Sequence, residues 1–181
     1  MREQAMGRAE TTELLSELLE RDVLSGTHWA REVKYVKHNG NTGRVDYMSF
    51  KPREQRYGPT AASIEGGEFT AYEIKSCKAD FESGHGLNFI AERNCIVCPM
   101  GLYKEIGDWA GYNDVSVYVP IPYYTGRPTT EQVYGSWANP EELTPAKGEW
   151  RLYKIRNQAI DANRRLSTAE LLFAMLKAGR M

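Results

Sequence analysis

Hydrophobic residues recur with two periods along this chain, and each period predicts a different kind of element. A helical period predicts an amphipathic helix near the N-terminus, which Thr11 or Thr12 can cap and Ser25-Gly26 can end. A second helix is expected near the C-terminus, where Ser167–Glu170 forms a capping box and Gly179 stops the helix. The apolar stripes of these helices are Leu14, Leu15, Leu18 and Leu19 in the first, and Leu171, Leu172, Met175 and Leu176 in the second.

Alternating runs rich in Val, Ile, Tyr and Phe predict the strands. Asn39-Gly40 lies between the first two runs and is a strong hairpin signal, so these runs are expected to pair antiparallel. The pattern predicts an α/β fold, in which a mixed central sheet is flanked by helices at the N- and C-termini. The expected strand ranges are 28–36, 44–50, 69–76, 93–99, 102–106, 114–121 and 150–155.

The length of 181 residues predicts one domain over 11–181, preceded by a flexible N-terminus over 1–10. Hydrophobic residues make up 41% of the chain and charged residues 26%, as in an ordinary globular protein, and no apolar run approaches the length of a membrane span. Three cysteines, an odd number with no secretory signal ahead of them, indicate reduced thiols and a cytoplasmic location.

The net charge of −1 provides no overall positive field toward nucleic acid, so any such contact must depend on local basic patches. Arg53 and Arg56 lie in the long polar connection 51–67, where they are either substrate contacts or solvated loop charges. A second basic patch is expected at Arg156, Arg164 and Arg165. The aromatic residues of 120–145 either stack on bases or cover a sheet edge.

Candidate chemistry lies on the strand that carries Glu73-Ile74-Lys75. Glu73 and Lys75 are two residues apart, so they share one face of the strand. A carboxylate binds a hard divalent cation, and a nearby ammonium stabilises charge that develops on a phosphate oxygen. Asp46, on the preceding strand, supplies a second carboxylate, so the three residues have the composition of a metal-dependent phosphodiesterase site. The alternative is a solvated strand face, because such triplets arise by chance and Glu32-Val33-Lys34 is another.

The order Asp46, Glu73-Ile74-Lys75 and Ser76–Phe81 resembles the PD-(D/E)xK nuclease superfamily, and in particular its small MmcB-like and phage-borne branches. The resemblance extends from about Thr11 to Gly179, although Val45 stands where the name-giving motif has proline. It implies a restriction-endonuclease-like fold and a Mg²⁺- or Mn²⁺-dependent hydrolase that cleaves DNA in phage or bacterial DNA processing or repair.

The same resemblance implies roles for individual residues. Asp46, Glu73 and the backbone carbonyl of Ile74 would bind the metal, and Lys75 would complete the catalytic set. A third acid is expected from Glu17 or Glu32; the alternatives are a solvated helix face for Glu17 and an ion pair with Lys34 or Arg44 for Glu32.

His85 and Asn88 are the expected substrate contacts beside the site, although an ordinary glycine turn explains the same residues. DNA is the expected partner, no membrane contact is expected, and a homodimer stays open. Two rival functions use the same fold without catalysis: nucleic-acid binding in repair, and a structural role in a phage particle.

Overall fold

The computed structural model describes residues 7–53, 58–122 and 150–179. In these residues, six strands form one sheet in the order β1-β2-β3-β4-β5-β6. Their bounds lie within two residues of the predicted ranges. The strands are β1 (His28–Val36), β2 (Thr42–Lys51), β3 (Glu68–Ile74), β4 (Arg93–Val97), β5 (Ser116–Pro122) and β6 (Trp150–Arg156).

The sheet is mixed. Three neighbouring pairs, β1 with β2, β2 with β3, and β5 with β6, are antiparallel. Strands β3 and β4 run in the same direction: the Phe69 N–H donates to the Glu92 carboxylate just before β4 (3.1 Å), and the Lys75 N–H donates to the Val97 carbonyl at its end (2.9 Å). The predicted α/β fold with a mixed, helix-flanked sheet is therefore confirmed.

Contacts divide the described residues into two compact units. The first is drawn from Met1–Ser25, Ile74–Ser83 and Ile96–Asn157, and the second from Gly26–Glu73, Gly84–Cys95 and Gln158–Met181. The chain passes between the units within β3 and within β4. Asp46 and Glu73 belong to the second unit, whereas Ile74 and Lys75 begin a segment of the first.

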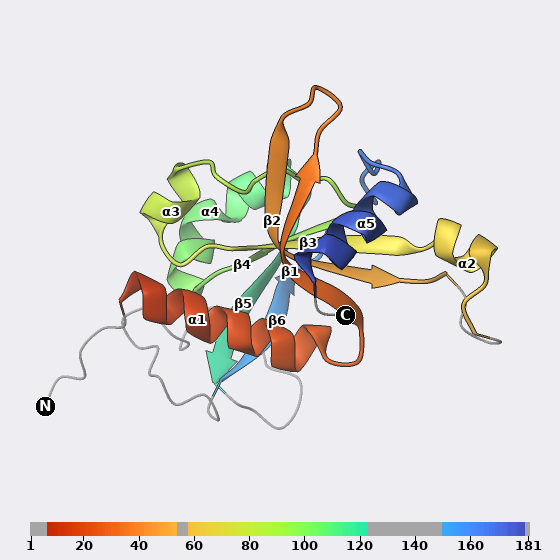
Figure 1. The fold of residues 1–181 in the computed structure, drawn as a ribbon. Coiled ribbons are helices and arrows are strands. Elements are labelled where there is room, and N and C mark those ends of the chain that lie inside the picture. The colour runs from red at the N-terminus through yellow and green to blue at the C-terminus, as the bar shows by residue number, and fades with distance from the viewer. Residues whose placement is uncertain (1–6, 54–57, 123–149, 180–181) are drawn as a thin grey trace, which may run out of the picture. The chain divides into compact units, whose positions relative to one another are not determined.

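The second unit is built on the β1–β2 hairpin (Figure 1). The Gly40 N–H donates to the Lys37 carbonyl, and Gly40 has a φ of 82°, so the predicted Asn39-Gly40 turn is present. Helix α5 (Thr168–Ala178) begins at the predicted Ser167 cap and lies alongside β1. A short helix, α2 (Ala61–Glu65), lies inside the long polar connection. The core of this unit includes Val33, Val45, Met48, Phe50, Phe69, Ile90, Leu171 and Met175.

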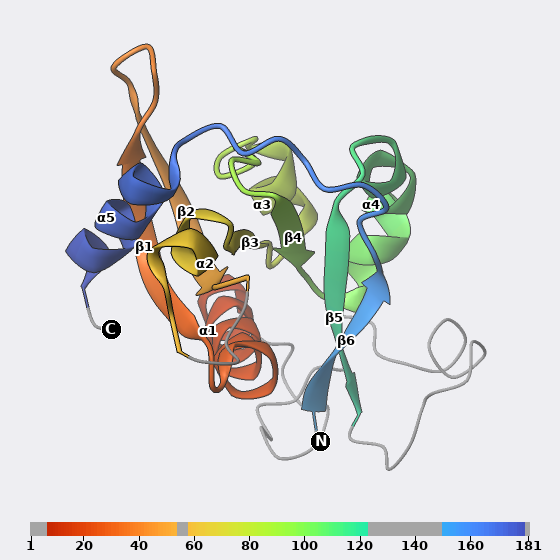
Figure 2. The same cartoon turned by 90° about the vertical axis from the view of Figure 1, so that its right-hand side faces the viewer.

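The first unit holds α1 (Arg8–Leu19), which continues as the π-helical turn η1 (Glu20–Leu24) and packs against β6. It also contains α3 (Lys78–Glu82) and α4 (Met100–Tyr112), the latter beside β5 (Figure 2). The strand predicted over 102–106 is wrong, because this range belongs to α4. Leu102, Ile106 and Ala110 recur every four residues and are buried on one helical face, a period that a five-residue window is too short to reveal.

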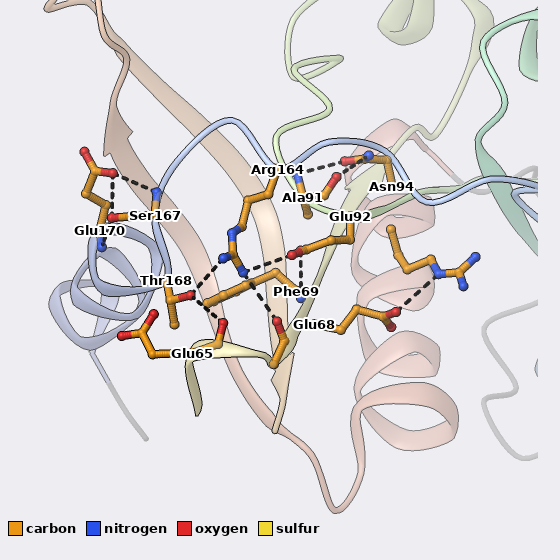
Figure 3. Close-up of polar contacts among 12 residues, drawn as sticks. Glu65, Glu68, Phe69, Ala91, Glu92, Asn94, Arg164, Ser167, Thr168 and Glu170 are labelled. Carbon is orange, nitrogen blue, oxygen red and sulfur yellow. Dashed lines mark hydrogen bonds and ion pairs between the residues drawn. The ribbon is translucent and has the colours of Figure 1, made fainter. Parts of the chain in front are cut away.

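Arg164 is a structural residue of the second unit (Figure 3). Its guanidinium lies 2.9 Å from the Glu92 carboxylate, donates to the Thr168 hydroxyl at 2.8 Å, and stacks 5.3 Å from the centre of the Phe69 ring. Glu92 in turn accepts the Phe69 N–H. The contacts of Arg164 therefore connect α5 to β3. The prediction that Arg164 belongs to a phosphate-facing patch is wrong.

Two further expectations concern the chain ends and the membrane. Helix α1 begins at Arg8, inside the range 1–10 that was expected to be flexible, and residues 1–6 lie outside the described residues. Most of the aromatic-rich segment 120–145 also lies outside them. Among the described helices, none combines the length and the apolar character that a membrane span requires.

Candidate metal centre

Two of the predicted metal ligands lie on neighbouring strands. The last ladder pair between β2 and β3 sets Tyr47 opposite Tyr72. Asp46 and Glu73 are the next residues on their strands, one step beyond this last pair. Carboxylates from neighbouring strands can bind one divalent cation when their oxygens converge. The strand register therefore supports the expected pairing of Asp46 with Glu73.

Asp46 also marks the place where β2 leaves β3. The pairing of β2 with β3 stops at Tyr47, whereas its pairing with β1 continues to Thr42 at the end of the hairpin. Figure 1 shows the hairpin extending past β3. Asp46 and Glu73 therefore lie at the point where β2 and β3 diverge.

Glu73 is buried beneath a glycine. Its side chain is 4% exposed. Gly86 has a φ of 85°, and a Cβ built on it would lie 2.3 Å from Glu73 Oε2 and 3.0 Å from Glu73 Cδ. A side chain here would require the Glu73 carboxylate to move, and the left-handed backbone also favours glycine. The carboxylate thus lies in a cradle that a methyl group would fill.

The loop that forms this cradle is fixed by Asn88. Its Nδ2 donates to the Arg44 carbonyl on β2 (3.2 Å), and its Oδ1 accepts a hydrogen bond from Lys37 Nζ just after β1 (3.2 Å). The Asn88 N–H closes a tight turn onto the Gly86 carbonyl (2.9 Å). Asn88, predicted as a substrate contact, therefore also holds the loop against the hairpin.

Arg44 neutralises the acids of the hairpin. Its guanidinium lies 2.8 Å from Glu32 Oε2 and 3.8 Å from Asp46 Oδ1. Glu32 lies between Arg31 and Val33, whose partners Tyr47 and Val45 flank Asp46, and it has a left-handed φ of 54°, which is strained for a residue with a side chain. Of the two interpretations of Glu32, the structure contains the ion pair with Arg44.

Ile74 and Lys75, the two residues that follow Glu73, are also buried. Lys75 is 3% exposed, Ile74 is buried, and the backbone at Lys75 is held by the hydrogen bond to Val97. The alternative in which Glu73 and Lys75 belong to a solvated strand face is therefore wrong. Burial of ionisable groups is costly without compensating interactions, and it is commonly found at functional sites.

The donor set available for a cation is small. Among residues 7–53, 58–122 and 150–179, no three His, Cys, Asp or Glu side chains gather into a group that could hold a metal ion. A divalent ion would depend on the Asp46 and Glu73 carboxylates and the Ile74 carbonyl. Carboxylate and carbonyl oxygens are the ligands that Mg²⁺ and Mn²⁺ prefer, and both ions retain water ligands, so these residues fit such an ion.

The remaining predicted residues are placed as follows. Glu17 lies on α1 in the first unit, half-buried with one carboxylate oxygen buried, so it is not on a fully solvated face. His85 is exposed on the loop before Gly86. Arg53 is exposed, and its N–H donates to the Ser63 carbonyl. Arg56 lies outside the described residues. The roles of Glu17 and Glu32 as a third acid stay predictions.

Two features of this unit were not predicted from the sequence. The contact of Gly86 with Glu73 joins a loop to a strand that is distant in sequence, and the only sequence signal is the Gly84-His85-Gly86 spacing. The Tyr35 ring lies against Gly43 on the partner strand, where a Cβ would lie 2.2 Å from the ring. An aromatic residue opposite glycine in a hairpin is a signal that sequence reasoning can use.

Comparison of the chain with protein-family models, with curated proteins and with solved structures found no match.

Proposed function

We propose that this protein is a metal-dependent nuclease of the PD-(D/E)xK type that hydrolyses DNA phosphodiesters, in phage or bacterial DNA processing or repair. The observation that carries the proposal is the position of Asp46 and Glu73 one residue beyond the last β2–β3 pair, with Glu73 buried in the cradle of Gly86. If Glu73 were an ordinary charge on a solvated strand face, it would need neither the burial nor a glycine beside its carboxylate.

The site residues would have different roles in phosphodiester hydrolysis. Asp46, Glu73 and the Ile74 carbonyl would hold Mg²⁺ or Mn²⁺, which when bound supplies Lewis-acid activation of water and phosphate. Lys75 follows Glu73 by two residues, and its ammonium would stabilise negative charge that develops on the phosphate oxygens. Arg44 lies 3.8 Å from Asp46 Oδ1, farther than from its closer partner Glu32.

The proposal is tested with linear, nicked, branched and single-stranded DNA, each with Mg²⁺, with Mn²⁺ and with chelator. We expect metal-dependent products that Asp46→Asn and Glu73→Gln abolish. Glu82→Gln is the matched control, because Glu82 is an exposed carboxylate outside the proposed donor set. Metal-independent binding without cleavage would instead support the rival nucleic-acid-binding function.

A further inference from the structure

A cavity of about 280 Å³ lies within the second unit. Its walls come from three separate stretches of chain: the end of β1 and its turn, the loop that carries Gly86, and the segment before α5. The residues that matter to its chemistry are Tyr35, Lys37, His38, Asn88 and Arg165, with Ile90 and Leu166 as apolar walls.

The cavity is held open by contacts between its walls. Lys37 Nζ donates to Asn88 Oδ1 (3.2 Å), and His38 Nε2 lies 2.9 Å from the Arg165 carbonyl. The Arg165 N–H donates to the Ile90 carbonyl (3.1 Å). Each pair of walls is thus joined by a hydrogen bond, so a ligand would meet a site that is already formed.

Tyr35 is a buried wall residue of this cavity. It is 4% exposed, and its hydroxyl has no hydrogen-bond partner within the described residues. Burial, reinforced by the charge of Glu73, raises the pKa of Tyr35 to about 12, although Arg165 opposes the shift. The hydroxyl therefore keeps its proton at neutral pH. A buried donor without an acceptor is costly, and the cost is removed when a ligand supplies the acceptor.

The charges of the cavity favour an anion. Lys37 and Arg165 carry two permanent positive charges, and the Tyr35 hydroxyl is a further donor, whereas His38 Nε2 is engaged with the Arg165 carbonyl and the charge of Glu73 acts on Tyr35 in the opposite sense. The carboxylate beside His38, that of Glu170, is already engaged by the Ser167 N–H and hydroxyl. Two cations match a phosphate monoester, which carries up to two negative charges, better than an internal phosphodiester, which carries one. Ile90 and Leu166 offer apolar surface for the group attached to the phosphate.

We infer that this cavity binds the terminal phosphate monoester of a nucleic-acid strand together with its end nucleotide. Its volume is slightly below the range of about 300–1,000 Å³ for drug-sized ligands, so one nucleotide is the size class it suits. The inference that the cavity binds a phosphate monoester depends only on the cavity. The inference that this phosphate belongs to a nucleic-acid strand rests on the proposed function. The loop that covers Glu73 through Gly86 also lines the cavity through Asn88 and Ile90, which links the two sites.

The test measures binding in chelator, so that it does not depend on metal or cleavage. Fluorescence anisotropy compares oligonucleotides with a 5′-phosphate, a 3′-phosphate or hydroxyl ends, with nucleoside monophosphate and inorganic phosphate as competitors. We expect one phosphorylated end to bind about tenfold or more tightly than hydroxyl ends, the size of a hydrogen bond to a charged group.

Lys37→Gln and Arg165→Gln should each remove most of this preference, and Lys34→Gln, an exposed lysine of β1 outside the cavity, should keep it. Tyr35→Phe should weaken binding of the phosphorylated end severalfold without lowering the melting temperature, which separates a ligand contact from a structural role. Equal binding of all ends by the parent protein overturns the inference, and so does displacement by free nucleotide without any preference between ends. If the protein prefers phosphorylated ends but never cleaves DNA, this inference holds and the proposed nuclease function is refuted. If it cleaves DNA without any preference between ends, the nuclease function holds and this inference is refuted.

Discussion

Replacing Gly86 with alanine should disable the metal site while leaving the protein folded. The new Cβ would lie 2.3 Å from Glu73 Oε2, so either the carboxylate or the loop must move. Asn88 holds the loop to the hairpin turn at Lys37 and to β2 at Arg44, and Glu73 is 4% exposed and has little room. The flexible end of the glutamate is the part that shifts most easily, so we expect the displacement to fall on the proposed ligand.

The stability cost can be worked from the backbone and the contact separately. Alanine in a left-handed conformation costs about 1–2 kcal/mol. Forcing the Glu73 side chain away from its preferred rotamer adds about 1 kcal/mol. For a protein of this size, each kcal/mol lowers the melting temperature by about 2–4 °C.

Gly84→Ala is the matched control. Gly84 has a φ of 68°, but nothing lies within 4 Å of a Cβ built on it. It therefore carries the same kind of backbone strain without the contact with Glu73. We expect Gly84→Ala to lower the melting temperature by a few degrees with Mn²⁺ affinity within about twofold of the parent, as for a typical change away from a site.

Gly86→Ala should melt lower still and bind Mn²⁺ at least about tenfold more weakly, since a 1 Å displacement of a functional group is that costly. Thermal melts and calorimetric titration of the two variants decide the matter. Parent-like Mn²⁺ binding by Gly86→Ala, or equal losses in both variants, would refute the assignment of Gly86 as the cradle of a metal ligand.

Three other outcomes are expected. Lys75→Met should lower the single-turnover cleavage rate about a hundredfold or more with little change in DNA affinity, because the ammonium acts mainly in the transition state; a parent-like rate would remove Lys75 from the catalytic set. Glu32→Gln should leave Mn²⁺ affinity within about twofold if Glu32 serves only Arg44, and a larger loss would make it the third acid. The hydrogen bond from the Ser167 N–H lowers the pKa of Glu170, so its contribution to stability is present above the ordinary glutamate pKa and is lost as pH falls through the lowered one. Parent and Glu170→Gln should therefore differ in melting temperature at pH 7 and converge in acid, and a constant difference would contradict this.

The parts of the fold that depend on local sequence could be predicted. Asn39-Gly40 set the hairpin, and the capping box at Ser167 set the start of α5. Alternation predicts that Glu73 and Lys75 share one face of their strand, and Asp46 is a candidate because it lies on the preceding predicted strand. Helix α4 was missed because its buried face repeats every four residues over a stretch that also contains short apolar runs.

What could not be predicted depends on contacts between distant segments. The sequence shows Arg164 and Arg165 as equivalent basic residues, yet Arg164 is bound to Glu92 and Phe69, whereas Arg165 lines the cavity. Likewise, Glu73 and Lys75 could be read as solvated charges until the packing around them was known. The burial of Glu73 and Lys75 depends on how the strands and loops pack around them, so it cannot be predicted from the spacing of these two residues.

The central claim is that Asp46 and Glu73 share one divalent cation, and calorimetric titration with Mn²⁺ tests it most directly. The parent protein should bind Mn²⁺ at a site that Asp46→Asn and Glu73→Gln each abolish or weaken strongly. The double variant should bind no more weakly than the weaker single variant, because ligands of the same ion are not additive. Undiminished Mn²⁺ binding in either single variant, or independent losses that add in the double variant, would contradict the claim.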